Sequence, residues 1–151
     1  MAIGCKIVWA PKDEAASTDF WTNHLGPLLE KHLAAEQERT GRTADLDVPA
    51  FMTIWEQRGM CVVMAYDGGT PVGFLIAFVF RPIFYRSINM HVERWYAETP
   101  EVEQQLFGFL STSANVLGIE ELHVAEQPAV PLPAGLDIDE SDTYRMVRVK
   151  V

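Results

Sequence analysis

Two apolar stretches joined by a short turn constrain the fold of this chain more than any other feature. Residues 60–66 (MCVVMAY) and 72–80 (VGFLIAFVF) are rich in β-forming side chains, and Asp67-Gly68-Gly69 separates them. Aspartate followed by glycine is typical of tight hairpin turns, because glycine reaches positive φ without steric cost. The sequence therefore predicts an antiparallel β-hairpin near the middle of the chain.

The segments around this hairpin show strand and helix patterns in a definite order. Before it, we expect strand 5–9, a helix that starts near Phe20 after an N-cap at Ser17, Thr18 or Asp19, a break or kink at Gly26-Pro27 with the helical pattern fading near Thr40-Gly41, and a helix from Pro49 to Gly59. After it, we expect strand 88–97, a helix with Thr99 as N-cap and Pro100 at its first position that runs to Gly118, strand 121–125 and strand 143–151. The 151 residues, 48% of them apolar, suit one domain over residues 1–151 of the α+β, or mixed α/β, class.

Charge and composition exclude several kinds of partner. The formal net charge is −9 and the pI is about 4.8, so nucleic acid and anionic membranes would repel the average field of the protein. No apolar run approaches the roughly 20 residues that a membrane span needs. Cys5 and Cys61 are the only cysteines, and the N-terminus has no signal-peptide layout. We therefore expect a cytoplasmic protein with reduced thiols.

The order of the predicted elements resembles the fold of the GCN5-related N-acetyltransferases (GNAT) over nearly the whole chain. Three stretches carry the resemblance, namely DGGTPVGFLIAF (67–78), HVERWYAETPE (91–101) and FLSTSANVLGIEELHV (109–124). The resemblance implies a twisted mixed sheet of about six to seven strands with helices on both faces. The segment FRPIFYRS (80–87) is similar to a subgroup of GNAT-like proteins encoded by tailed phages, which implies a location in the host cytoplasm or the virion.

The chain departs from the family pattern where the family binds acyl-CoA. In the family, acyl-CoA docks where the fourth and fifth strands splay apart, and an Arg/Gln-x-x-Gly-x-Gly/Ala loop follows the fourth strand. Its glycines let the backbone approach the pyrophosphate closely and donate several N–H groups. This chain instead has EVEQQ at 101–105 and no glycine before Gly108. We therefore expect the pyrophosphate loop to be missing.

Prolines and carboxylates point the same way. Pro128, Pro131 and Pro133 follow the predicted strand 121–125, where family members usually have a helix. From Trp95 to Tyr144 there is no lysine or arginine, but there are ten acids: Glu98, Glu101, Glu103, Glu120, Glu121, Glu126, Asp137, Asp139, Glu140 and Asp142. Each nearby carboxylate opposes a bound phosphate by roughly 1 kcal/mol when exposed to solvent. The first three are expected to stabilise the positive end of the helix that starts at Pro100.

The resemblance also implies candidate site residues. His91 and Glu93 share one face of strand 88–97, where the family often has a general base, although an exposed polar strand face explains the same pattern. Tyr144 could protonate a leaving thiolate, or it could be a partly buried aromatic. Trp95, Tyr96 and Ala97 could offer backbone groups to pantetheine. If the protein is an enzyme, its catalytic residues are thus expected to be Glu93, His91 and Tyr144 and its cofactor acetyl-CoA; otherwise no cofactor is expected.

Arginines and aromatic residues alternate around the turn before strand 88–97. Arg81, Arg86 and Arg94 occur with Phe84 and Tyr85, a mixture that is enriched in the centres of protein interfaces. In an acidic protein this favours a protein partner or a homo-oligomer over nucleic acid. The histidines and cysteines show no metal-ligand spacing, so no metal site is expected.

Three functions remain open at this point. The missing loop, the prolines and the acidic segment favour a non-catalytic GNAT-like protein, such as a binding module or a phage virion-associated structural module. The first alternative is an active acyl-CoA-dependent N-acetyltransferase with a degenerate cofactor site. The second is an acidic protein that binds a basic partner through the surface from Glu98 to Asp142.

Overall fold

The computed structural model of the protein describes residues 2–84, 86–124, 131–133, 136 and 149. In chain order, its elements are β1 (Ile3–Val8), α1 (Glu14–Asp19), the π-helix η1 (Phe20–Leu25), α2 (Gly26–Thr40), α3 (Val48–Glu56), β2 (Met60–Asp67), β3 (Thr70–Phe80), β4 (Asn89–Ala97), α4 (Pro100–Val116) and β5 (Glu121–Val124). The order is the one predicted from the sequence.

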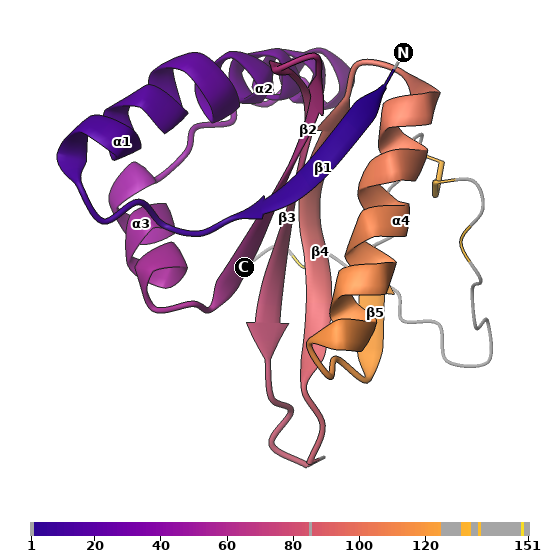
Figure 1. Ribbon diagram of the computed structural model, residues 1–151. Coiled ribbons are helices and arrows are strands. Elements are labelled where there is room, and N and C mark those ends of the chain that lie inside the picture. The colour runs from indigo at the N-terminus through magenta and orange to yellow at the C-terminus, as the bar shows by residue number, and fades with distance from the viewer. Residues whose placement is uncertain (1, 85, 125–130, 134–135, 137–148, 150–151) are drawn as a thin grey trace.

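One mixed sheet organises the described residues. Its strand order is β1-β2-β3-β4-β5, in which β1 to β4 are antiparallel neighbours and β5 runs parallel to β4 (Figure 1). A parallel pair needs a long crossover, and α4 supplies it. Five strands lie in the described part, fewer than the six to seven expected, and of the predicted strand 143–151 the structure describes only Val149. The α+β class and the mixed sheet are confirmed.

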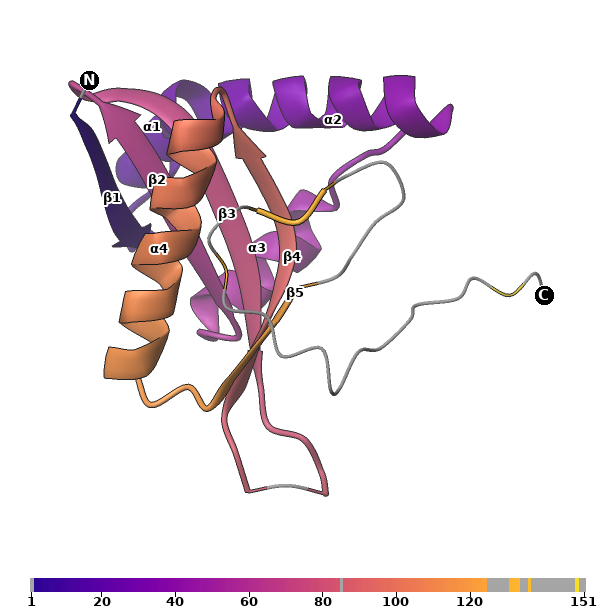
Figure 2. The ribbon, with the colours of Figure 1, turned by 90° about the vertical axis from the view of Figure 1, so that its right-hand side faces the viewer.

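Helices cover both faces of the sheet, as predicted. Figures 1 and 2 show α1, α2 and α3 on one face and α4 on the other. The α4 face is filled by one cluster of buried side chains that includes Leu75, Val92 and Leu106. The opposite face is filled by a second cluster around Trp55 and Phe74. The sheet therefore has two separate apolar layers, and β4 contributes side chains to both.

The central hairpin forms as the turn residues predict. Gly68 and Gly69 have φ angles of 55° and 88°, and Asp67 lies opposite Thr70 in the β2–β3 register. Residues that have a Cβ atom adopt such positive φ values only with backbone strain. The dipeptide Gly68-Gly69 therefore fixes the register of the two most buried strands of the sheet.

The first helical region begins earlier than predicted, and of the break or kink expected at Gly26-Pro27, the break does not occur. The helix begins at Glu14, and its N-cap is Asp13, whose carboxylate accepts a hydrogen bond of 2.8 Å from the Ala16 N–H, rather than Ser17, Thr18 or Asp19. The chain also remains helical through Gly26-Pro27. Residues 20–25 form a π-helix, in which the Gly26 N–H donates to the Trp21 carbonyl, and a Cβ at Gly26 would lie 2.0 Å from that oxygen. The wider π turn accommodates Pro27, which has no N–H to continue the α-helical pattern.

Candidate functional site

The structure describes pairing between the parallel strands β4 and β5 over the first part of β4. Their register runs from Asn89 opposite Glu121 to Val92 opposite Val124. On the other side of β4, Ala77 pairs with Val92 and Ile76 with Arg94, so Glu93 is an extra residue in a β-bulge. From Glu93 to Ala97, β4 has no partner on its β5 side within the described part of the chain. Among the described residues, none occupies the backbone N–H and C=O groups of this edge as a paired strand, so an extended ligand could bind them.

Two histidine–carboxylate pairs lie near the last described β4–β5 residue pair. His91 Nε2 lies 3.5 Å from Glu93 Oε2, and both side chains are partly exposed. On β5, His123 Nε2 lies 2.8 Å from Glu121 Oε2, and His123 is opposite His91 in the strand register. The structure thus brings together His91 and Glu93, the two candidate bases from the sequence. The third candidate, Tyr144, lies outside the described residues.

The side chains of Trp95 and Tyr96 are used for packing on opposite faces of the sheet. The Trp95 indole N–H donates to Glu103 Oε2 at 3.0 Å, and its ring meets Phe107 edge to face. Tyr96 stacks on Phe74, with 6.4 Å between the ring centroids. Any contact of Trp95, Tyr96 and Ala97 with pantetheine therefore rests on the backbone, which is the form in which it is predicted.

The connection from β4 to α4 consists of Glu98 and Thr99 alone. Thr99 caps the helix, since its hydroxyl accepts from the Val102 N–H at 3.3 Å and its carbonyl accepts from the Glu103 N–H at 3.2 Å. Pro100 has no N–H. Among residues 100–103, Glu101 is thus the one whose N–H has no such partner in the described part of the chain. An anion here would thus meet one free amide rather than a series of them.

The glutamates at this junction differ in their positions and contacts. Glu101 and Glu103 lie in the first turn of α4, where a negative charge is favourable, as predicted. Glu98 precedes the helix, and its carboxylate accepts a hydrogen bond of 2.7 Å from the Lys31 ammonium of α2. This bond raises the pKa of Lys31. Glu98 therefore links the junction to α2, which the sequence pattern did not indicate.

A small cavity of about 210 Å³ lies between α2 and β4, next to Glu93. It is lined by His32, Ala35, Glu36, Arg39, Glu93, Arg94 and Trp95. Glu36 is hydrogen-bonded to Arg39 at 2.5 Å and to Arg94 at 2.7 Å. Burial opposes the ionisation of Glu36, but these guanidinium groups outweigh it and lower the pKa of the carboxyl.

Sequence reasoning missed the α2 side of this cavity. His32, Glu36 and Arg39 follow a helical spacing that places them on one face of α2, and that spacing was the available signal. Burial lowers the pKa of His32, and its Nε2 is buried without a hydrogen-bond partner among the described residues. The cavity therefore combines a fixed ion-pair network with an unsatisfied ring nitrogen.

The arginine-rich loop before β4 separates into two parts. Arg81, Phe84 and Arg86 lie on the β3–β4 connection and are exposed, whereas Arg94 lies within β4 and binds Glu36. Tyr85 lies outside the described residues. Of the five residues predicted to bind a partner, four thus lie in the described part of the chain, three on the β3–β4 connection and Arg94 within β4.

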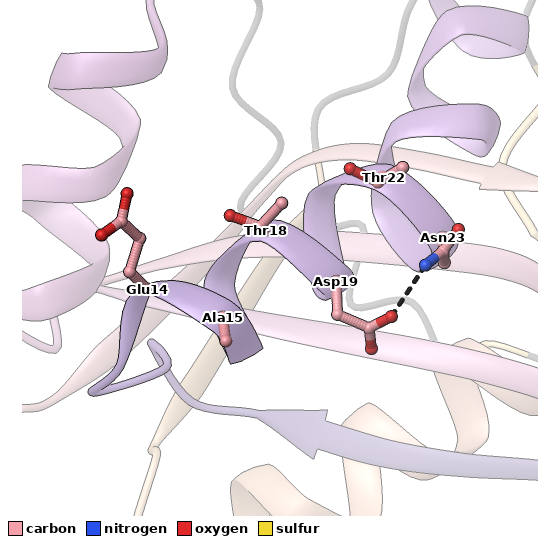
Figure 3. A pocket seen from close by; sticks show the side chains of 6 residues that line it. All are labelled: Glu14, Ala15, Thr18, Asp19, Thr22 and Asn23. Atoms are coloured by element: carbon pink, nitrogen blue, oxygen red, sulfur yellow. Dashed lines mark hydrogen bonds between the residues drawn. The ribbon is translucent and has the colours of Figure 1, made fainter.

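A second hollow lies on the outer surface of α1 and η1 (Figure 3). It is lined by Glu14, Ala15, Thr18, Asp19, Thr22 and Asn23, and the Asn23 amide donates to Asp19 at 2.7 Å. All six residues come from one continuous helical segment. Since no second element closes it, this hollow is a surface depression and takes no part in the site at β4.

Comparisons with solved structures identify the fold. The chain is similar to an aminoglycoside acetyltransferase from an uncultured soil metagenomic sample, in complex with sisomicin, with a TM-score of 0.69, 12% identity, and coverage of 98% of this chain and 97% of that one. It is also similar to a ribosomal-protein-alanine N-acetyltransferase from Brucella melitensis biovar Abortus 2308, with a TM-score of 0.65, 17% identity, and coverage of 98% and 100%. A GNAT family acetyltransferase from Staphylococcus aureus gives a TM-score of 0.59 at 7% identity, with coverage of 97% and 100%. The sequence matches no protein-family model, and no curated protein matches it.

The protein therefore has a GNAT-like fold. At these identities the likeness extends to the fold alone. Within the described residues, no helix is long and apolar enough to cross a membrane, and no group of three His, Cys, Asp or Glu side chains is placed to hold a metal ion.

Proposed function

We propose that the protein is an acyl-CoA-dependent N-acyltransferase that holds the acyl-thioester arm of its donor along β4 and uses the phosphates of the donor little. The sequence alone favours a non-catalytic module, but the structures with this fold described above are acetyltransferases, which favours the enzyme. The proposal accounts for both the hydrogen-bonding edge of β4 and the unusual β4–α4 junction.

The observation that carries the proposal is the β-bulge at Glu93, which directly follows the last β4–β5 pair that the structure describes. Beyond it, the edge from Glu93 to Ala97 has free hydrogen-bonding groups in the described part of the chain. The pantetheine arm contains two amides, so it can lie along this edge as an added strand does. The thioester then reaches the bulge, beside the His91–Glu93 pair.

The reaction needs a base at this place. The nitrogen of a neutral amine attacks the thioester carbonyl, a C–N bond forms, the C–S bond breaks, and the thiolate leaves. Glu93, with His91 3.5 Å away, takes the proton that the amine loses. Tyr144 remains a prediction as the residue that protonates the thiolate.

The junction at Glu98 and Thr99 explains why the phosphates are expected to contribute little. One free amide and three carboxylates replace a loop that donates several N–H groups. The nucleotide part of CoA therefore gains little from this protein, and the thioester arm supplies most of the binding free energy.

The test compares acetyl-CoA with S-acetylpantetheine, which has the same reactive arm and no phosphate. Thermal unfolding of the full chain at low salt, with each ligand up to about 10 mM, is expected to show saturable stabilisation of similar size. Binding of acetyl-CoA more than tenfold tighter would contradict the minor role of the phosphates. Stabilisation by neither ligand would rule out the enzyme.

The β4–α4 junction favours a second candidate function, a non-catalytic protein-binding module. In that case the N-terminus of α4 is closed by its own chain because no cofactor binds there. This candidate predicts no response to either ligand, so the same experiment separates the two.

A further inference from the structure

The tip of the β3–β4 connection carries two large apolar side chains that are almost wholly exposed. Ile83 is 95% exposed and Phe84 is 90% exposed. Figures 1 and 2 show that this connection projects beyond the end of the sheet. Single exposed apolar residues are ordinary, but two adjacent ones at the tip of a projecting loop are typical of a contact surface.

A second exposed apolar pair lies at the same end of the molecule. Val116 is 82% exposed and Leu117 is 48% exposed, at the C-terminal end of α4. The chain that follows adjoins the base of the loop, because the Glu120 N–H donates to the Ile88 carbonyl at 2.9 Å. The two apolar pairs therefore belong to one end of the same protomer.

Opposite charges accompany the two pairs. Arg81 and Arg86 are exposed on the loop, and no acid occurs from residue 81 to 92. Glu120 and Glu121 are exposed beyond α4, and no lysine or arginine occurs from residue 95 to 144. In a chain of net charge −9, the loop is a local positive surface next to a negative one.

We propose that the protein forms a twofold-symmetric dimer through this end. Ile83 and Phe84 of each copy pack on Val116 and Leu117 of the other, and the loop arginines face Glu120 and Glu121. A twofold interface must be complementary to itself, and this surface contains both an apolar tip with positive charge and an apolar patch with negative charge. A second copy supplies both complements at once, with an apolar centre and a charged rim.

The association state of the full chain tests this directly. Sedimentation from about 1 to about 100 μM is expected to show a monomer–dimer equilibrium. Phe84→Asp and Val116→Asp are each expected to weaken dimerisation at least about tenfold, since each removes an anchor from both halves of the interface. Val48→Asp, a similar change at an exposed apolar residue of α3, is the matched control and leaves the dimer unchanged.

Exchange of charges tests the pairing itself. Arg86→Glu alone and Glu120→Lys alone each place like charges together in both halves, and each is expected to weaken the homodimer. A mixture of the two variants restores an oppositely charged pair in both halves, so a heterodimer is expected. A monomer at every concentration would overturn the proposal, and so would a dimer that none of these changes affects. Neither outcome bears on acyl transfer.

Discussion

The two sides of β4 differ in packing and polarity. On the α4 side, Trp95 is fixed by Phe107 and Glu103. Val102 and Leu106 of α4 are buried in the apolar layer between this helix and the sheet. On the α2 side, a cavity of about 210 Å³ remains, with a charged network and a buried ring nitrogen that has no partner among the described residues. Apolar packing thus fills one side, and polar groups line an open space on the other.

The contrast shows how a strand can hold a site without losing its place in the fold. Close packing against α4 fixes the position of β4. The other side and the free edge can then keep groups whose hydrogen bonds are incomplete, at a cost that the packed side offsets. Changes on the α4 side should therefore have the largest effect on stability, and changes on the α2 side and at the junction should act through charge.

The largest expected effect is at the centre of the packed side. Leu106 is 0% exposed, so Leu106→Ala is expected to lower the free energy of unfolding by about 2–5 kcal/mol, through lost burial and a cavity. Urea unfolding measures it. Val48→Ala, at a 43% exposed position, is the control with an expected loss below about 1 kcal/mol. Similar losses in both variants would show that α4 is not closely packed.

Two glycines sharpen the same point. A Cβ at Gly73 of β3 would lie 2.7 Å from a Val102 methyl group and 2.9 Å from the Tyr96 carbonyl oxygen, so Gly73→Ala is expected to cost about 1–3 kcal/mol. A Cβ at Gly108, inside α4, meets nothing within 4 Å. Gly108→Ala should therefore stabilise the protein, by about 0.4–1 kcal/mol. The opposite signs make thermal unfolding of the two variants a direct comparison, and equal signs would contradict the close approach of α4 to β3.

A pH series tests the charged network on the open side. The pKa of Glu36 is lowered from 4.5, so its stabilising contribution is present above about pH 4.5 and is lost as the pH falls through the lowered value. Glu36→Gln removes this titration and the ion pairs that Glu36 makes with Arg39 and Arg94. We expect the variant to be about 1 kcal/mol less stable at pH 7 and the difference to shrink towards pH 3. Glu38→Gln, at an exposed position of α2, is the control, and an unchanged difference at low pH would argue against the network.

Much of the fold could be predicted because its signals are local. The Asp67-Gly68-Gly69 turn and the Thr99-Pro100 helix start depend on neighbouring residues, and both lie where expected. The predicted start of the first helix was wrong. Asp13 caps this helix, and Ser17, Thr18 and Asp19 lie within it. The π-helix was missed since a Gly-Pro pair ordinarily signals a break.

The candidate site was only half predictable. His91 and Glu93 are two residues apart on one strand, so regular alternation predicts that they share a face, and their pairing is kept although Glu93 lies in a β-bulge that the sequence did not indicate. The contact of Arg94 with Glu36 joins residues from different elements, and so does the contact of Lys31 with Glu98. No periodic pattern in the chain encodes either contact, because both depend on how α2 crosses the sheet.

The last expected effect is on ligand binding rather than on stability, and it concerns the β4–α4 junction. Changing Glu98, Glu101 and Glu103 together to glutamine removes three negative charges, yet a glutamine at 103 can still accept from the Trp95 indole. Each exposed carboxylate opposes a phosphate by roughly 1 kcal/mol or less, so acetyl-CoA is expected to bind no more weakly and up to about tenfold more tightly at low salt. Calorimetric titration measures this change, and added salt should reduce it, because Glu98 and Glu101 are exposed and Glu103 is partly exposed. S-acetylpantetheine has no phosphate, so its binding should not change. Weaker binding of acetyl-CoA would mean that these carboxylates help to form the site. If they only repelled the phosphates, their neutralisation could not weaken binding.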